Sequence, residues 1–211
     1  MHAVAREQYV KCGKDLAHHL RNLEILKKEW DDSAMMKRIA IENARLATTQ
    51  KPRRYIKEIE EEFLPQFMEG ELLRRRKFLV LDGDSGLGKT VCAQTLATST
   101  EHFLEVNCAT CAEPPLRDYN CNQHEVVFFD EVKPQMVIKQ KRLYQAPNVF
   151  ITLGCSPTNK DTYKVYMYGT KIVLASNTWE HDVNHLENPQ DRDWLRKNQV
   201  YIKVTEPLWQ V

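Results

Sequence analysis

A phosphate-binding loop constrains the fold of this chain more than any other feature of its sequence. Residues 83–90 read Gly-Asp-Ser-Gly-Leu-Gly-Lys-Thr and match the pattern G-x-x-x-x-G-K-[ST]. They follow an apolar run at residues 78–81 and precede a helical pattern at residues 91–97, which is the strand–loop–helix context that the motif requires. The alternative, a glycine-rich turn that binds nothing, does not need Lys and Thr in this register. The sequence therefore predicts a nucleoside triphosphate site.

The residues of this loop have separate expected roles. Lys89 is expected to reach the β- and γ-phosphates, and the hydroxyl of Thr90 is expected to ligate Mg²⁺. Backbone N–H groups wrap the phosphates, and the helix N-terminus adds a favourable dipole. The other expected contacts come from Gly83, Asp84, Ser85, Gly86, Leu87 and Gly88. We therefore expect ATP and Mg²⁺ as the cofactors.

The composition limits the cellular compartment and the partners that we expect for this protein. The chain is 42% apolar and 28% charged, as in ordinary soluble proteins, and no apolar run approaches the roughly 18 residues of a membrane span. Six cysteines without a secretory signal indicate reduced thiols and a cytoplasmic or nuclear location, without a membrane partner. The net charge of +1 excludes a general attraction to nucleic acid, so any such contact needs local basic clusters.

Two regions differ in the period of their apolar residues. Residues 1–72 are expected to form a small helical collar or oligomerisation module, because apolar residues recur at helical spacing and strand signals are missing. Its third expected helix carries Ile56, Ile59 and Phe63, and Pro65 interrupts it. From residue 73 to 211, short apolar runs alternate with helical segments, which predicts an α/β domain with a parallel sheet. The expected strands are residues 78–81, 103–106, 126–129, 172–175 and 200–204.

An extra pair of strands, at residues 149–153 and 163–168, is expected between the third and fourth strands of the sheet. The residues that join them are rich in turn formers, so the pair is predicted to be a β-hairpin. The tyrosines of its second strand are expected to pack across the hairpin, except at its tip.

Polar side chains follow two of the expected strands. Asp130 and Glu131 come directly after residues 126–129, and a buried parallel strand presents such groups at the edge where the phosphate loop lies. Asp130 is expected to hold Mg²⁺, and Glu131 to polarise the attacking water. Asn177, after residues 172–175, is a candidate for a hydrogen bond to the γ-phosphate and that water. The alternative is that Asn177 only caps the segment that follows.

Taken in order, the phosphate loop, Phe-Phe-Asp-Glu, the hairpin and Ala-Ser-Asn resemble the motifs of superfamily 3 helicases over about residues 75–205. The most similar branch is the helicase domain of the replication initiator (Rep) proteins of circular single-stranded DNA viruses, with picornaviral-type RNA helicases as relatives. The resemblance implies a P-loop NTPase of AAA+-like fold with a five-stranded parallel sheet in the order 5-1-4-3-2. It also implies a homo-oligomeric ring, expected to be a hexamer, with ATP sites shared between subunits and single-stranded DNA or RNA as partner.

The resemblance also implies roles for basic residues. Lys160 and Lys164 hold the hairpin positions that contact the single strand, with Tyr163 beside them as a stacking surface. Arg192 and Arg196 match the arginine finger that acts on the neighbouring subunit's ATP, and the position of Arg196 just before the last strand favours it. The nicking domain of Rep proteins is not expected here, because no strand pattern precedes Lys77 and the histidine pair at residues 18–19 falls in a predicted amphipathic helix.

Three alternatives stay open on the sequence alone. A small-molecule P-loop kinase would bind ATP at the same loop, but it has no use for the hairpin. An NTP-binding assembly or regulatory protein would keep the motifs without unwinding nucleic acid. Independently of these, four residues with the spacing C-x₂-C…C-x₂-H form a ligand set acceptable to zinc or, alternatively, unconnected thiols: Cys108, Cys111, Cys121 and His124.

Overall fold

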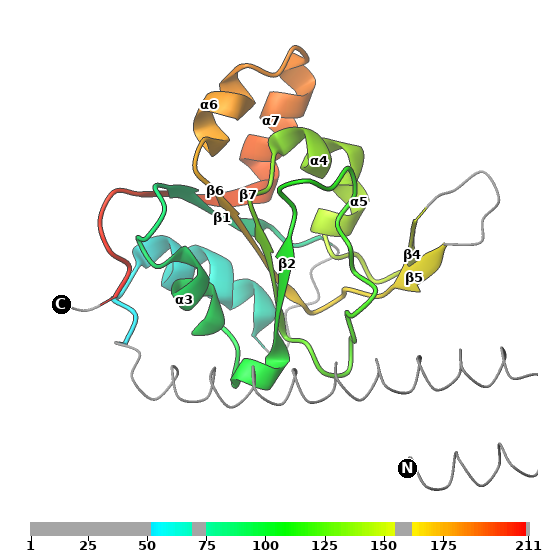
Figure 1. The fold of residues 1–211 in the computed structure, drawn as a ribbon, viewed down its shortest axis with the longest axis horizontal. Helices are drawn as coiled ribbons and strands as arrows, with labels where there is room; N and C mark the ends of the chain where they lie inside the picture. The colour runs from blue at the N-terminus through cyan, green and yellow to red at the C-terminus, as the bar shows by residue number, and fades with distance from the viewer. Residues whose placement is uncertain (1–51, 69–74, 155–161, 210–211) are drawn as a thin grey trace, which may run out of the picture. The chain divides into compact units, whose positions relative to one another are not determined.

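The predicted sheet is the centre of the α/β domain. The computed structural model describes residues 52–68, 75–154 and 162–209, and in these residues a five-stranded parallel sheet has the order β2-β3-β6-β1-β7 (Figure 1). Its strands are β1 Phe78–Gly83, β2 Phe103–Asn107, β3 Val126–Asp130, β6 Lys171–Ser176 and β7 Gln199–Val204. Counted as strands one to five along the chain, they lie in the expected order 5-1-4-3-2. The predicted α/β fold is therefore confirmed.

Both faces of this sheet are buried at its three central strands, which explains why β1, β3 and β6 are almost continuously apolar. Every residue of β1 is buried. Phe78 and Val80 point into one core, and Leu79 and Leu81 point into the core on the opposite face. A parallel sheet covered by helices on both faces requires this pattern, since successive side chains alternate between the faces.

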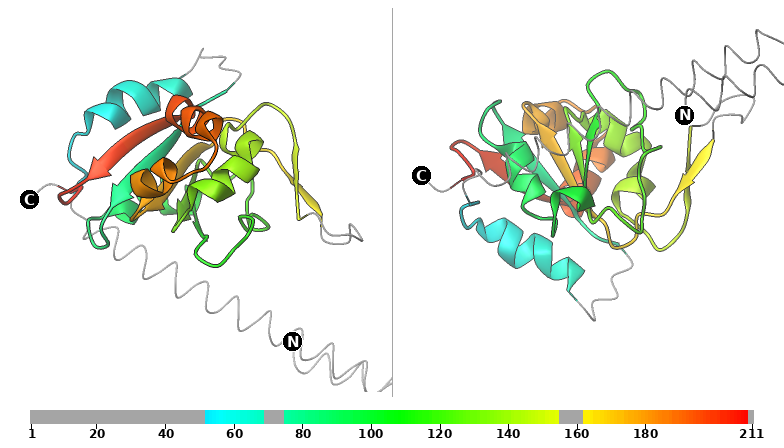
Figure 2. Two further views of the ribbon diagram at one scale, coloured as in Figure 1. Left: turned by 90° about the horizontal axis from the view of Figure 1, so that it is seen from above. Right: turned by 60° about the horizontal axis from the view of Figure 1, so that its bottom comes forward.

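Different helices cover the two faces. Four helices contribute to the first core: α4 Pro134–Lys139, α5 Lys141–Tyr144, α6 Trp179–Asn184 and α7 Pro189–Asn198. The second core is closed by α3 Lys89–Gln94 and by the helical segments η1 Glu58–Phe63 and η2 Leu64–Phe67. Figure 2 shows η1 and η2 on the opposite side of the sheet from α6 and α7. A short turn, η3 Thr100–His102, leads into β2.

The segment η1–η2 corresponds to the third predicted helix, and it packs on the sheet. Ile56 is 7% exposed, and Ile59 and Phe63 are fully buried in the second core. This segment belongs to the compact unit that runs from Lys51 to Val211. Residues 52–68 therefore pack with the α/β domain, although the sequence placed them in the module at residues 1–72. The other predicted helices of that module lie outside the described residues.

The predicted hairpin is present as an antiparallel pair, β4 Ile151–Leu153 and β5 Tyr163–Val165. Its register places Ile151 opposite Val165 and Leu153 opposite Tyr163. The two strands form a separate small sheet, which lies beyond α5 in Figure 1. The joining residues 155–161, and with them Lys160, lie outside the described residues. In the parts of the chain that the structure describes, no helix combines the length and apolar character needed to cross a bilayer.

Candidate nucleotide site

The phosphate loop joins the end of β1 to the start of α3, as the motif predicted. Gly86 and Gly88 have φ angles of 81° and 82°, in the left-handed region that favours glycine. Gly88 is also the residue at the N-cap of α3, so the chain turns sharply into the helix there. Lys89 and Thr90 are the first two residues of this helix. Their side chains are therefore presented at the rim of the loop.

The ammonium group of Lys89 connects the loop to the end of a neighbouring strand. Its Nζ donates to the backbone oxygen of Gly83, to that of Asp84 at 3.1 Å and to Oδ1 of Asn177 at 2.8 Å. Burial lowers the pKa of Lys89, and the surrounding carboxylates, Asp130 and Glu131 foremost, oppose that effect. The Lys89 ammonium is thus a buried cation beside carboxylates. A phosphate chain could bind the cation, and Mg²⁺ could bind the carboxylates.

Strand order brings the other predicted polar residues to the same place. β3 and β6 are neighbours in the sheet, so Asp130, Glu131 and Asn177 follow strands that end side by side. Asn177 Nδ2 lies 3.4 Å from Glu131 Oε1, toward which it donates. Lys89, Asn177 and Glu131 therefore form one connected polar chain, and the N-cap of α6 is Thr178, so Asn177 does not cap this helix.

Glu131 holds its position through an uncommon backbone conformation. Its φ angle is 57°, in the left-handed region, where a residue with a β-carbon is disfavoured by about 1 kcal/mol. The next residue ties this turn to β6, because Val132 N donates to the Ala175 oxygen at 3.0 Å. Strained residues of this kind are concentrated at functional sites.

These residues surround a cavity of about 330 Å³. Its walls are the phosphate loop, the start of α3, the carboxylates of Asp130 and Glu131, the amide of Asn177 and the indole of Trp209. Thr90 and Asp130 supply a hydroxyl and a carboxylate to this cavity, and Mg²⁺ prefers such hard oxygen ligands together with phosphates and water. The donor set therefore fits the expected ion.

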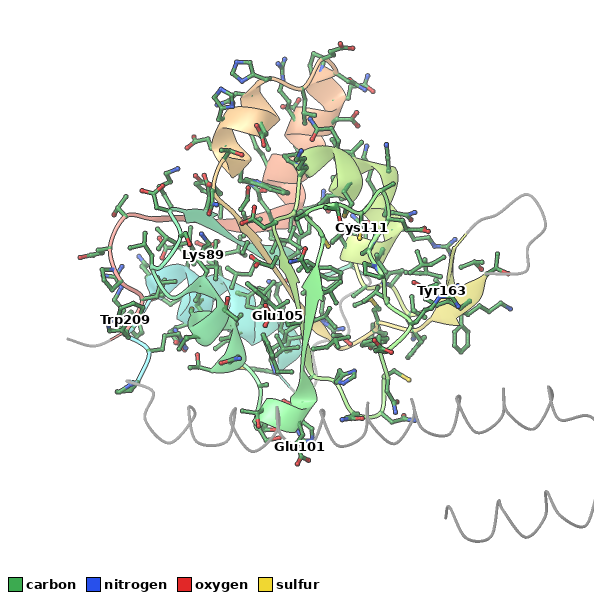
Figure 3. All side chains as sticks on the ribbon, in the orientation of Figure 1. Lys89, Glu101, Glu105, Cys111, Tyr163 and Trp209 are labelled. Atoms are coloured by element: carbon green, nitrogen blue, oxygen red, sulfur yellow. The ribbon has the colours of Figure 1, made fainter. Side chains whose placement is uncertain are left out.

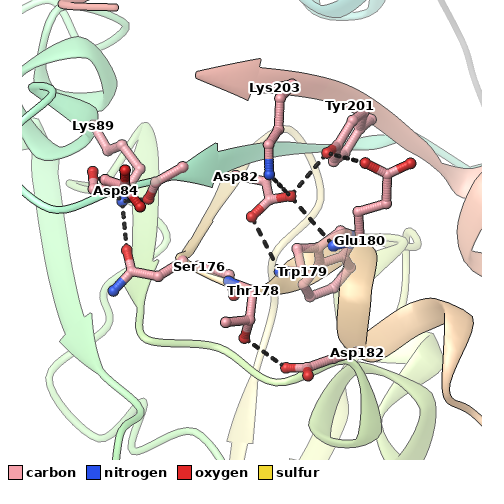
Figure 4. A network of polar contacts seen from close by, with 12 residues as sticks. Asp82, Asp84, Lys89, Ser176, Thr178, Trp179, Glu180, Asp182, Tyr201 and Lys203 are labelled. Carbon is pink, nitrogen blue, oxygen red and sulfur yellow. Dashed lines mark hydrogen bonds and ion pairs between the residues drawn. The ribbon is translucent and has the colours of Figure 1, made fainter. Parts of the chain in front are cut away.

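A buried carboxylate beside the site was not predicted from the sequence. Asp82, the penultimate residue of β1, is fully buried and accepts four hydrogen bonds (Figure 4). The donors are Tyr201 Oη at 2.8 Å, Lys203 Nζ at 3.1 Å, Trp179 N at 3.1 Å and Glu180 N at 3.2 Å. Burial by itself raises the pKa of Asp82, but these hydrogen bonds outweigh it and the pKa is lowered.

This network fixes the segment that carries Asn177. The two backbone donors to Asp82 belong to the first turn of α6, which begins two residues after Asn177. The ionised Asp82 thus caps α6 across the sheet, since no side chain of the helix's own N-cap does so. The only feature of the sequence that could have indicated this role is that Asp82 is an acidic residue within an otherwise apolar strand.

A second unpredicted carboxylate, Glu105 on β2, lies near the middle of the labelled residues in Figure 3. Partial desolvation raises the pKa of Glu105, which stays exposed on β2, and the charge of Asp130 raises it further.

The two candidate arginines lie on α7 and do not line this cavity. Arg196 is exposed, donates to Asn184 Oδ1 at 2.8 Å and borders a separate cavity of about 270 Å³. Arg192 donates to the oxygens of Leu186 and Asn184, at 3.2 and 3.4 Å. Within one chain, neither arginine is in place to contact a nucleotide, so a role for either requires a second copy.

The hairpin residues have different surroundings. Lys164 is exposed on β5, opposite Thr152. Tyr163 is half-buried: its hydroxyl accepts a hydrogen bond from Leu116 N at 2.9 Å, and the Arg117 guanidinium lies 4.8 Å from its ring centre. These contacts attach the hairpin to the segment before β3.

The cysteine–histidine pattern does not form a metal site in the described residues, where no group of three or more His, Cys, Asp or Glu is arranged to hold an ion. Burial raises the pKa of Cys108 to about 12, with a smaller contribution from Cys111. His124 Nδ1 instead accepts a hydrogen bond from Asn120 N at 3.0 Å. The pattern therefore corresponds to the alternative of unconnected thiols.

Comparison with known proteins finds distant likenesses to solved structures only. A scan against models of known protein families finds no match, and neither does a search of curated proteins. Among solved structures, the Hsp104–ADP complex of S. cerevisiae is 15% identical with a TM-score of 0.42, over 68% of this chain and 31% of that one. The apo C-terminal region of NrS-1 (residues 305–718 of that protein) is 14% identical with a TM-score of 0.36, over 73% and 48%. This chain thus spans less than half of either.

The class of protein follows from the chain's own architecture. A parallel sheet of order 5-1-4-3-2 carries a phosphate loop after its first strand, two carboxylates after its third and an asparagine after its fourth. This combination is a P-loop NTPase fold of the AAA+-like kind.

We predict that Asp82→Asn lowers the free energy of unfolding by about 2–3 kcal/mol at pH 7, because a buried hydrogen-bonded charge is lost. The lowered pKa means that this stabilisation is complete above the ordinary value of 3.8 and is lost progressively as pH falls from that value through the lower pKa of the folded protein. Urea unfolding of both proteins between pH 3 and 8 measures the difference, with the exposed Asp193→Asn as control. A difference that persists undiminished at pH 3, or none at pH 7, would contradict this role.

Proposed function

We propose that this chain is the ATP-hydrolysing domain of a nucleic-acid motor of the viral Rep type, a helicase or translocase on single strands. The observation that carries the proposal is the connected chain of Lys89, Asn177 and Glu131 beside Asp130 in one cavity. The hairpin β4–β5 supports a motor over a small-molecule kinase, since a kinase has no use for it.

Each group in the cavity has a role in this reaction. Lys89, which bonds two loop carbonyls and Asn177, would exchange those partners for the β- and γ-phosphate oxygens. Glu131 would accept the proton of the attacking water, and Asn177, between Lys89 and Glu131, would orient that water toward the γ-phosphate. Thr90 and Asp130 would hold Mg²⁺, which supplies charge neutralisation at the phosphates when bound.

Two substitutions separate binding from hydrolysis. Lys89→Ala removes the cation that faces the phosphates, so ATP affinity and turnover should both fall. Glu131→Gln keeps the shape and removes the base, so ATP should still bind while kcat falls by roughly 10²-fold or more. ATP binding by calorimetry and phosphate release measure the two effects. Wild-type turnover by Glu131→Gln would remove Glu131 from the proposed mechanism.

The position of Arg196 on the surface leads to a proposal of shared sites. If Arg196 completes the site of a neighbouring copy in a ring, activity per subunit should rise with protein concentration. Arg196→Ala should then lose turnover on the order of 10³-fold while still binding ATP, whereas the exposed neighbour Lys197→Ala should not.

Mixing Arg196→Ala with Lys89→Ala provides the control for this proposal. Some interfaces in the mixture combine an intact arginine with an intact phosphate loop, so part of the activity should return. A turnover rate independent of concentration, with no recovery in the mixture, would exclude shared sites.

The proposed motor must also bind the single strand, and we propose that Lys160 and Lys164 of the hairpin region contact its phosphates. The double substitution to Ala should leave basal ATPase unchanged but abolish its stimulation by single-stranded DNA or RNA. ATPase rates against oligonucleotide concentration at two salt concentrations measure this, with the exposed Lys139→Ala on α4 as control.

The outcome of this titration also separates the alternative functions. Stimulation that survives in the double variant contradicts the proposed contact. Nucleotide-dependent assembly of the wild type without any stimulation would favour a regulatory ATPase, and phosphorylation of a small acceptor would favour a kinase.

A further inference from the structure

The segment after β7 runs back past the phosphate loop and is held there by backbone contacts. Leu208 N donates to the Leu87 oxygen at 3.0 Å, and Arg54 N donates to the Leu208 oxygen at 3.1 Å. Arg53 and Trp209 form an antiparallel bridge. Leu208 is also buried in the second core. The position of Trp209 is therefore set by backbone contacts with the loop and with residues 53–54, and it does not depend on its own side chain.

The indole of Trp209 packs directly on the phosphate loop. A β-carbon added to Gly88 would lie 2.4 Å from Cζ3 and 2.5 Å from Cε3 of Trp209, which is closer than atoms can approach. The same indole lines the nucleotide cavity and is only half-buried. Figure 3 shows Trp209 and Lys89 on the same flank of the molecule. An aromatic surface is thus held beside the loop and open to the cavity.

Polar and apolar groups contribute to this cavity in different ways. The polar groups that could contact a γ-phosphate are joined by hydrogen bonds, from Lys89 through Asn177 to Glu131. Val91, which follows Thr90 in α3, and Trp209 supply apolar lining. A nucleoside triphosphate has a matching division, because a charged phosphate chain is joined to a flat aromatic base.

We propose that Trp209 is the platform on which the nucleobase stacks. This inference rests on the proposed function, and it assigns the specificity of the same site. Stacking engages the face of a base and not its hydrogen-bonding edge, so it accepts every base and favours those with larger rings. The substrate class is therefore purine nucleoside triphosphates, with ATP and GTP bound about equally and CTP and UTP more weakly.

The test compares ATP with inorganic tripolyphosphate, which offers the same charges without a base. Affinities for both, measured by calorimetry, are compared among wild type, Trp209→Ala and Trp209→Phe. Trp209→Ala should weaken ATP binding about 10-fold or more and leave tripolyphosphate binding unchanged, whereas Trp209→Phe should retain most of the ATP affinity. Lys89→Ala should weaken both ligands. Tyr55→Ala should weaken neither, because Tyr55 is an exposed aromatic residue that follows Arg53 and Arg54 and does not line the cavity.

The possible failures are distinct. An equal loss of ATP and tripolyphosphate affinity in Trp209→Ala would show that the indole only supports the loop, and it would overturn the inference. Unchanged ATP affinity in this variant would also overturn it, while both results leave the proposed NTPase intact. If wild type binds ATP no better than tripolyphosphate, no base platform exists. If it binds neither ligand, the proposed function fails, and this inference fails with it.

Discussion

The buried ammonium group of Lys89 is the interaction on which the rest of the site depends. Burial disfavours its charge, and the carboxylates at the ends of neighbouring strands oppose that cost. Its bonds to the loop carbonyls and to Asn177 join β1, its loop and the end of β6 into one unit. Only the observed strand order, with β6 between β1 and β3, brings these groups together.

A second charge, the buried carboxylate of Asp82, acts on the same segment. Lys89 holds the side chain of Asn177, and Asp82 holds the backbone N–H groups of Trp179 and Glu180. The turn between β6 and α6 is therefore clamped between a cation and an anion that both come from β1 and its loop. Asp82 is itself held by Tyr201 and Lys203 on β7, so the last strand of the sheet also contributes to the geometry of Asn177.

The sequence predicted the elements and site residues that depend on residues close together in the chain. It missed the residues whose roles depend on contacts between distant parts of the chain. Apolar runs located the strands because both faces of the sheet are buried, and fixed spacing located Lys89, Asp130 and Glu131. Asp82 and Trp209 were missed, because the role of each depends on a partner far along the chain, Tyr201 for one and Gly88 for the other. The strand order itself came from family resemblance and not from local pattern.

The positive φ angle of Glu131 has a consequence for how such a chain would change under relaxed selection. Gly or Asn tolerates this conformation better, so either replacement would relieve strain and would also remove the proposed base. Stability and the proposed hydrolysis thus make opposite demands on one position. A related protein that used this fold only for assembly would gain stability by replacing Glu131. The identity of residue 131 would then distinguish an active ATPase from an inactive one.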